Sequence, residues 1–145
     1  MPDLLSYGVQ YTVRSQQHRP LTIERLRDIG IRFIRVTWVD LTNVIRFRVV
    51  PIAHFERILA SRRPSVSMVR GALGVVSIAL AEGFSSTGEF LYLVDMDSLR
   101  VCTYAPGHAS VMGWYEEKVP IRGVDGIPRF DVDLCPRTTL KRIVK

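Results

Sequence analysis

The 145-residue sequence has few of the features that mark secreted, membrane-spanning or disulfide-bonded proteins. It contains two cysteines, Cys102 and Cys135, without a Cys-x-x-Cys motif, which favours reduced thiols. No apolar run reaches the roughly 18 residues that a membrane span requires, and the first residues lack the basic segment of a secretory signal peptide. We therefore expect a cytoplasmic, single-domain protein that does not cross a membrane.

Lysine is also scarce, because 17 of the 20 basic residues are arginine. The charge is uneven: residues 1–73 hold 12 Arg and 5 acidic residues for a net +7, and residues 74–145 hold 5 Arg, 3 Lys and 9 acidic residues for a net −1. Nucleic-acid-binding surfaces usually carry lysine and a recognition motif as well, and neither zinc-finger spacing nor an RNP-type aromatic motif is present. Nucleic-acid binding thus rests on charge alone. The arginines favour the grip of a carboxylate or phosphate, or burial at an interface.

Motifs for metal, phosphate or nucleophilic chemistry are missing too. The histidines His18, His54 and His108 are scattered and form no i, i+4 pair, which disfavours a zinc site. Gly71 and Gly74 lack the Lys-Ser/Thr of a phosphate-binding loop. The sequence therefore predicts no catalytic residue, no metal ligand and no cofactor for the chain itself.

The local patterns alternate between helix and strand. Thr22 is a suitable N-cap for a first helix, and Gly30 suits the left-handed position after its end. We predict strands over 31–39, 44–50, 90–94, 99–104 and 108–116, helices after Pro51 and over 137–144, a weak strand and long loop over 66–88, and a loop over 119–134 with a turn at Asp125-Gly126. This order predicts an α+β fold with one mixed or antiparallel sheet of about five strands and packed helices. Residues 1–20 are predicted to form a flexible arm.

Two adjacent strands, 31–39 and 44–50, carry the candidate site. Alternation predicts a hairpin with one apolar face and one face bearing Arg35, Arg46 and Arg48, with Arg48 opposite Arg35 if the turn is symmetric. Like charges directly opposite are destabilising, so the arginine face is expected to meet carboxylates or an anionic ligand. The alternative is a solvated sheet face. Trp38 is predicted to belong to the core, with binding as the lesser role, and Asp40 to shape the turn through bonds to the backbone.

Four segments of the sequence resemble the N-terminal domain of the glutamine synthetase family. They are the runs 26–51, 87–100, 104–109 (Tyr-Ala-Pro-Gly-His-Ala) and 135–142 (Cys-Pro-Arg-Thr-Thr-Leu-Lys-Arg), and they occur in the family's order. The first contains Ile34-Arg35-Val36-Thr37-Trp38-Val39-Asp40, and the second contains Gly88-Glu89-Phe90-Leu91-Tyr92. The resemblance covers roughly residues 20–145. Within the family, the sequence is most similar in character to the glutamine synthetase-like, FluG-like group.

The resemblance implies a β-grasp domain over 21–134 and the start of a linker helix over 135–145. In the family, this domain packs on a larger catalytic domain, subunits form rings, and active sites lie between the N-terminal domain of one subunit and the catalytic domain of the next. The family makes γ-glutamyl phosphate from ATP and glutamate and then an amide with ammonia or an amine, in glutamine biosynthesis and nitrogen metabolism. The expected partners are therefore a catalytic domain or a neighbouring subunit in a homo-oligomer.

The sequence also departs from the family. The catalytic domain, with its ATP, Mg/Mn and glutamate sites, has no counterpart within the 145 residues. Where the bacterial enzyme has an Asp-Gly-Ser-Ser loop, this chain has Arg70-Gly71-Ala72-Leu73, so Arg70 replaces the acid. Two hypotheses follow. The chain is the structural, active-site-completing N-terminal domain of a glutamine synthetase-like ligase, or it is a stand-alone, repurposed domain that binds, oligomerises or has new chemistry.

Overall fold

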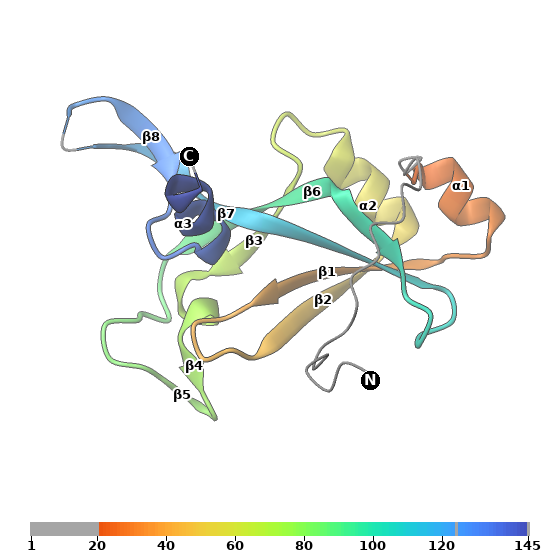
Figure 1. Ribbon diagram of the computed structural model, residues 1–145, viewed down its shortest axis with the longest axis horizontal. Coiled ribbons are helices and arrows are strands. Elements are labelled where there is room, and N and C mark those ends of the chain that lie inside the picture. Colours follow the sequence, from red (N-terminus) through yellow and green to blue (C-terminus); the bar gives the residue numbers. More distant parts are fainter. Residues whose placement is uncertain (1–20, 124, 145) are drawn as a thin grey trace, which may run out of the picture.

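A mixed β-sheet forms the centre of the chain (Figure 1). The computed structural model describes residues 21–123 and 125–144, so the predicted arm over 1–20 lies outside the described residues, as does His18. The strand order is β2-β1-β7-β6-β3, and β8 pairs with β7. These strands are β1 (Phe33–Val39), β2 (Ile45–Pro51), β3 (Ser65–Val69), β6 (Glu89–Val101), β7 (His108–Arg122) and β8 (Pro128–Asp131). The short strands β4 (Val75–Val76) and β5 (Ala79–Leu80) form a separate hairpin.

Within the described residues, three α-helices accompany the sheet: α1 (Ile23–Asp28), α2 (Ile52–Leu59) and α3 (Pro136–Ile143). A short 3-10 helix, η1 (Arg70–Leu73), follows β3. The predicted start of α1 is confirmed, because the Thr22 hydroxyl accepts a hydrogen bond from the Arg25 backbone N–H at 3.3 Å. The predicted end is confirmed as well, since Gly30 has a φ of +81°.

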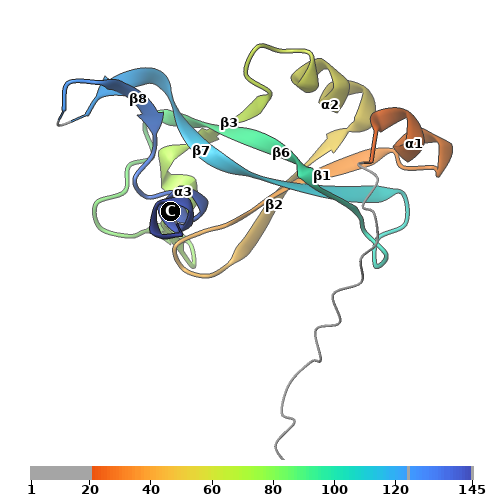
Figure 2. The ribbon, with the colours of Figure 1, turned by 45° about the horizontal axis from the view of Figure 1, so that its top comes forward.

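The sheet topology confirms the predicted α+β class. β1 and β7 run parallel in the middle of the sheet, and the other neighbours are antiparallel, as in a β-grasp sheet. The main sheet has six strands rather than about five. Helices α1 and α2 lie on one side of the sheet, and α3 lies on the other side at its opposite end (Figure 2).

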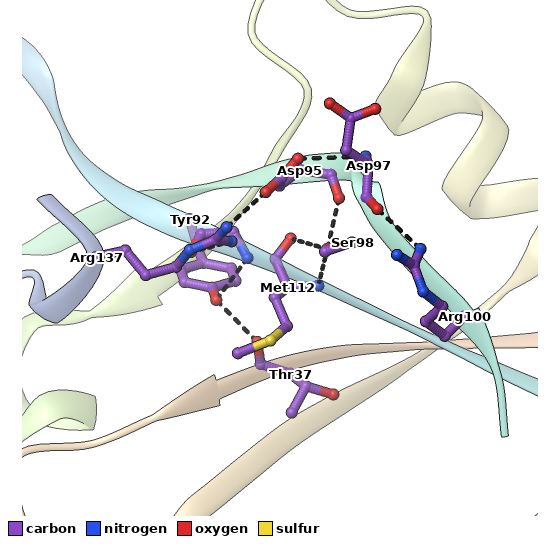
Figure 3. Close-up of polar contacts among 9 residues, drawn as sticks. Thr37, Tyr92, Asp95, Asp97, Ser98, Arg100, Met112 and Arg137 are labelled. Carbon is purple, nitrogen blue, oxygen red and sulfur yellow. Dashed lines mark hydrogen bonds and ion pairs between the residues drawn. The ribbon is translucent and has the colours of Figure 1, made fainter. Parts of the chain in front are cut away.

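The predicted break between strands 90–94 and 99–104 is wrong, because β6 runs through it as one strand. Its register shifts between Asp95 and Arg100. The Ser98 hydroxyl bridges this bulge: it accepts from the Met112 backbone N–H at 2.8 Å and donates to the Asp95 carbonyl at 2.6 Å (Figure 3). A side chain thus replaces a ladder bond, and the strand continues.

The segment predicted as a loop over 119–134 is an arm of paired strands in its first part. β7 continues to Arg122, and Ile121 pairs with Arg129 of β8. The predicted turn at Asp125-Gly126 is confirmed, since Gly126 has a φ of +74° and donates its N–H to the Gly123 carbonyl. The arm residues are mostly exposed on both faces, so the sequence shows no apolar alternation there.

The core fills the space between the sheet and helices α1 and α2. Leu26 of α1 and Phe55 of α2 are fully buried. They belong to one cluster with the inward-facing strand residues, among them Ile34, Val36, Val111 and Tyr115. The predicted inward face of β1 is therefore confirmed.

The predicted register of the β1–β2 hairpin is wrong by one residue. Arg48 lies opposite Val36, and Arg35 lies opposite Val49. The connecting loop has five residues, 40–44, rather than four, because Asn43 adopts a left-handed φ of +62°. A slip of one residue turns every side chain of a strand to the other face.

The slip separates the three arginines of the predicted face. Arg46 and Arg48 are register partners of Trp38 and Val36, so they share the core side of the sheet, at its β2 edge. Arg35 shares the opposite side with the apolar residues of β2, which are Ile45, Phe47 and Val49. The expected repulsion between Arg35 and Arg48 therefore does not arise.

Candidate docking face

The side of the hairpin opposite the core exposes large apolar side chains. Ile45 is 70% exposed, Phe47 49% and Tyr104 74%. Phe33 and Val49 are also exposed. We call the surface formed by Phe33, Arg35, Ile45, Phe47, Val49, Tyr104 and His108 the docking face. Helix α3 lies at the other end of this side, where Lys141 sits 4.5 Å from the Trp114 ring.

Arg35 lies at the centre of the docking face. Its Nε donates to Nδ1 of His108 at 3.3 Å. Its guanidinium carbon lies 4.7 Å from the Phe47 ring centroid and 5.5 Å from that of Tyr104. Phe33 stacks on His108 with ring centroids 5.1 Å apart. A cation held between aromatic rings in an apolar surround is suited to meet a carboxylate on a protein surface.

Asp40 and Arg46 form an ion pair at the hairpin turn. Asp40 is 3% exposed, and its Oδ2 accepts from Nε of Arg46 at 2.5 Å. Its Oδ1 accepts from the backbone N–H groups of Thr42 and Val44, each at 2.9 Å, so the predicted turn-shaping role is confirmed. Burial alone would raise the pKa of Asp40, but the hydrogen bonds from Thr42, Val44 and Arg46 outweigh it and lower the pKa to about 2.

Arg46 and Arg48 also tie β2 to distant parts of the chain. Arg46 donates to the Val75 carbonyl at 3.1 Å, and Arg48 donates to the Ser67 carbonyl at 3.0 Å. Since β2 and β3 are the two edge strands of the sheet, the hydrogen bond from Arg48 to Ser67 connects one edge of the sheet to the other. Both arginines are thus engaged within the fold, and Arg46 meets a carboxylate, that of Asp40.

Trp38 and Arg70 occupy two further places. Trp38 is 8% exposed and packs beside Tyr92, which confirms its predicted place in the core. Arg70 pairs with Glu117 at 2.8 Å and lies 4.7 Å from the Phe90 ring centroid, near the β3 end of the sheet. The structure therefore brings Asp40 and Arg46 together, sets Arg48 on the same side of the sheet as Trp38, and sets Arg35 on the opposite side.

Sequence reasoning missed the residues that surround Arg35. The predicted alternation places the apolar residues of strand 44–50, Phe47 among them, on the face opposite Arg35, whereas the five-residue turn brings Phe47 to the same side as Arg35. Tyr104 and His108 come from a separate turn, and they reach Arg35 because β1 and β7 pair in parallel with Phe33 beside His108. No local pattern in the sequence signals that pairing.

Two classes of site have no support among the described residues. No group of three or more His, Cys, Asp or Glu side chains that could hold a metal ion occurs within residues 21–123 and 125–144. Over the same residues, no helix has both the length and the apolar character to cross a membrane.

Comparison with known proteins identifies solved structures that share this fold. No family model matches the sequence, and no curated protein sequence matches it. Among solved structures, a complex of GmaS with ADP is 19% identical over 86% of this chain, with a TM-score of 0.58. GmaS without ligand is 18% identical over 69% of this chain (22% of the GmaS chain), with a TM-score of 0.52. A novel glutamine synthase homolog is 23% identical over 77% of this chain, with a TM-score of 0.57.

The fold is therefore one that occurs within glutamine synthetase-like proteins, as the sequence resemblance predicts. The chain spans about a quarter of the length of these solved proteins, at 25% of the GmaS chain in its ADP complex and 25% of the glutamine synthase homolog.

Proposed function

We propose that the chain is the N-terminal domain of a glutamine synthetase-like ligase, which joins glutamate to ammonia or an amine at the expense of ATP. The domain completes the assembly and its active site and carries out no chemistry alone. The observation that supports this most is the likeness of most of the chain to a quarter of a longer protein that was solved with ADP. ATP, Mg²⁺ or Mn²⁺ and glutamate then belong to the catalytic domain. The enzyme acts in the cytoplasm, in nitrogen metabolism.

The docking face is the surface through which the domain meets its partner in this proposal. Phe47 and Tyr104 supply apolar area of the kind that is buried at the centre of domain interfaces. Arg35 between them binds a carboxylate of the catalytic domain or of a neighbouring subunit in a homo-oligomer. The aromatic flanks hold the guanidinium in place before contact, which lowers the entropy cost of docking.

Arg70 makes a contribution to an ammonium site unfavourable in this chain. Its guanidinium is already paired with Glu117. An arginine also offers only N–H donors and no carboxylate oxygen to accept hydrogen bonds from an ammonium ion. The proposed role is therefore one of shape and assembly, with no acid supplied by the segment 70–73.

The second hypothesis, a stand-alone binding or oligomerisation module, is favoured by the same exposed apolar face. A surface that exposes Ile45, Phe47 and Tyr104 suits a second copy of the chain as well as a catalytic domain. The two hypotheses differ in what the gene encodes after this domain.

The reading frame downstream of codon 145 tests the proposal. The proposal expects a catalytic domain encoded in the same frame. In that longer protein, Phe47→Ser should lower amide-forming turnover at least tenfold, while Ile78→Ser, a fully exposed residue outside the docking face, should leave it unchanged. A stop codon at position 146 would contradict the proposal and favour the stand-alone module.

A further inference from the structure

We propose that residues 9–14 of this chain pair as an additional strand in the gap between β2 and β3, the two edges of the main sheet. This pairing closes the sheet and does not depend on the proposed ligase role. The gap contains a groove of about 390 Å³. The groove is lined by residues 48–51 of β2, His54 and Ile58 of α2, and residues 65–67 of β3. The side chain of Arg48 crosses the gap by donating to the Ser67 carbonyl at 3.0 Å.

On the β2 side, every second residue turns its backbone groups toward the gap. The Ile52 N–H donates to the Arg32 carbonyl at the end of the β1–β2 ladder. Hydrogen-bonded pairs alternate along an antiparallel ladder, so Phe47 and Val49 direct their N–H and C=O groups away from β1. The β2 wall of the gap is therefore a row of backbone donors and acceptors.

The β3 side of the gap has the same character. The Val94 N–H donates to the Pro64 carbonyl at the end of the β3–β6 ladder, so Ser65 and Ser67 direct their backbone groups away from β6. In the part of the chain that the structure describes, no backbone hydrogen bond reaches the gap from either wall. Two facing edges with unpaired backbone groups are a template for an inserted strand.

The segment 9–14, which lies outside the described residues, has the sequence pattern of a strand with one apolar face. The apolar residues Val9, Tyr11 and Val13 alternate with the polar residues Gln10, Thr12 and Arg14. In the proposed pairing the apolar set lies on the core side of the gap, beside buried Val50 and Val66, and the polar set lies on the other side. The pattern thus suits a position between two edge strands above a core.

The connection to α1 favours this segment over a strand from another molecule. Residues 15–20 join the segment to Leu21, and six extended residues span about 20 Å. Helix α1 lies beside α2, which borders the gap, and the pair of Arg27 with Glu56 at 2.5 Å joins the two helices (Figure 1). Linkage within one chain gives the segment a higher effective concentration at the gap than a separate peptide has.

Amide hydrogen exchange of the full 145-residue chain, followed by NMR, tests the proposal. The probes are the Val49 and Ser67 amides, which face the gap. Thr12→Pro removes a backbone donor from the proposed strand, and a proline is not accommodated in a strand that is paired on both sides. We expect both amides to exchange at least tenfold faster in Thr12→Pro than in the wild type. Gln17→Pro, outside the proposed strand, is the control and should keep the slow exchange.

A second pair of variants tests which face of the strand is buried and needs no proline. Tyr11→Glu places a charge on the apolar face and should also speed exchange at Val49 and Ser67, whereas Gln10→Glu on the polar face should not. Equal exchange in the wild type and Thr12→Pro would overturn the proposal, as would equal effects of Tyr11→Glu and Gln10→Glu. Protection that falls on dilution would also overturn it, because the strand would then come from a second copy.

Discussion

Asp40 shows how a single buried carboxylate holds the hairpin turn. It accepts hydrogen bonds from Thr42 and Val44 and pairs with Arg46 while almost fully buried. Removing one partner of such a group leaves the others unpaired, so the cost exceeds that of one surface ion pair. Arg46 therefore acts first of all to stabilise the fold, by pairing with buried Asp40.

Replacing Asp40 with Asn should lower the free energy of unfolding at neutral pH by about 2–3 kcal/mol, because the charged acceptor is lost. Asp97→Asn is the matched control, since Asp97 is exposed and its carboxylate makes no contact of this kind within the described residues. Urea unfolding measures both. Equal stability of the two variants would contradict the account of the turn.

The pH dependence follows from the same carboxylate. The pKa of Asp40 falls from its ordinary value of 3.8 to about 2 on folding, so the folded chain binds fewer protons than the unfolded chain in that range. The stabilisation by Asp40 is thus complete above about pH 4 and is lost as the pH falls toward about 2. Asp40→Asn should remove this part of the acid-unfolding profile, while Asp97→Asn should keep it.

Tyr92 and Tyr115 form a matched pair of buried tyrosines that differ in their hydrogen bonds. Tyr92 is 2% exposed and bridges Thr37 and Gly113, whereas Tyr115 is 1% exposed and its hydroxyl has no partner among the described residues. Burial raises the pKa of both phenols, so both stay neutral at physiological pH.

Tyr92→Phe should lower the free energy of unfolding by about 1–3 kcal/mol, because it leaves two backbone groups unpaired. Tyr115→Phe should be neutral or slightly stabilising, because it removes an unpaired hydroxyl. Chemical unfolding of the two variants checks the difference. The reverse order of stabilities would show that the bridge between β1 and β7 is unimportant.

At the scale of elements, the β1–β2 turn decides which face of the sheet each arginine occupies. The loop closes through Asn43 at a φ of +62°, a conformation that costs β-branched residues more than Asn or Gly. The same five-residue loop sets Arg48 opposite Val36. The turn thus controls the composition of the docking face.

Asn43→Val should therefore destabilise the chain by about 1–2 kcal/mol, and Asn43→Gly should be neutral or slightly stabilising. Thermal unfolding of the two variants provides the measurement. If both variants behave like the wild type, Asn43 does not adopt the left-handed conformation and the hairpin register must be reconsidered.

The elements that were predictable from the sequence are those with local signals. Thr22 and Gly30 mark the ends of α1, and the alternation of Ile34, Val36 and Trp38 marks the inner face of β1. The hairpin register was not predictable, because β-branched Val44 reads as strand while it lies in the loop. A propensity pattern reports strand tendency but not the number of residues in a turn.

The remaining errors have tertiary causes. The bulge of β6 depends on Ser98 and its contact with Met112 of another strand, which no local pattern reveals. The arm of β7 and β8 lacks a buried face, so it gives no alternation signal. The cluster around Arg35 joins residues 47, 104 and 108, and it forms through the parallel pairing of β1 with β7.

At the scale of the whole molecule, the charge asymmetry of the sequence is not an asymmetry of the fold. The basic first half and the more acidic second half interleave in one sheet, in which β7 lies between β1 and β6. Arg63 pairs with Glu116 and Arg70 with Glu117, so two arginines of the first half are neutralised by the second. The arginine excess therefore supports the fold as well as any interface.

The docking face should be separable from the core. Phe47→Ser should change the free energy of unfolding by less than about 1 kcal/mol, because Phe47 is half-exposed. The same substitution at fully buried Phe55 should cost about 3–5 kcal/mol. Urea unfolding compares the two. A large loss in Phe47→Ser would assign this residue to the core and weaken the case for a docking face.

The central claim, that the domain completes a ligase and is not catalytic alone, is tested most directly by a phosphate-release assay on the folded 145-residue chain. The assay supplies ATP, Mg²⁺, glutamate and either ammonia or methylamine, and circular dichroism verifies that the chain is folded. We expect no glutamate-dependent phosphate release above the rate in buffer. Robust turnover that requires both ATP and glutamate would contradict it.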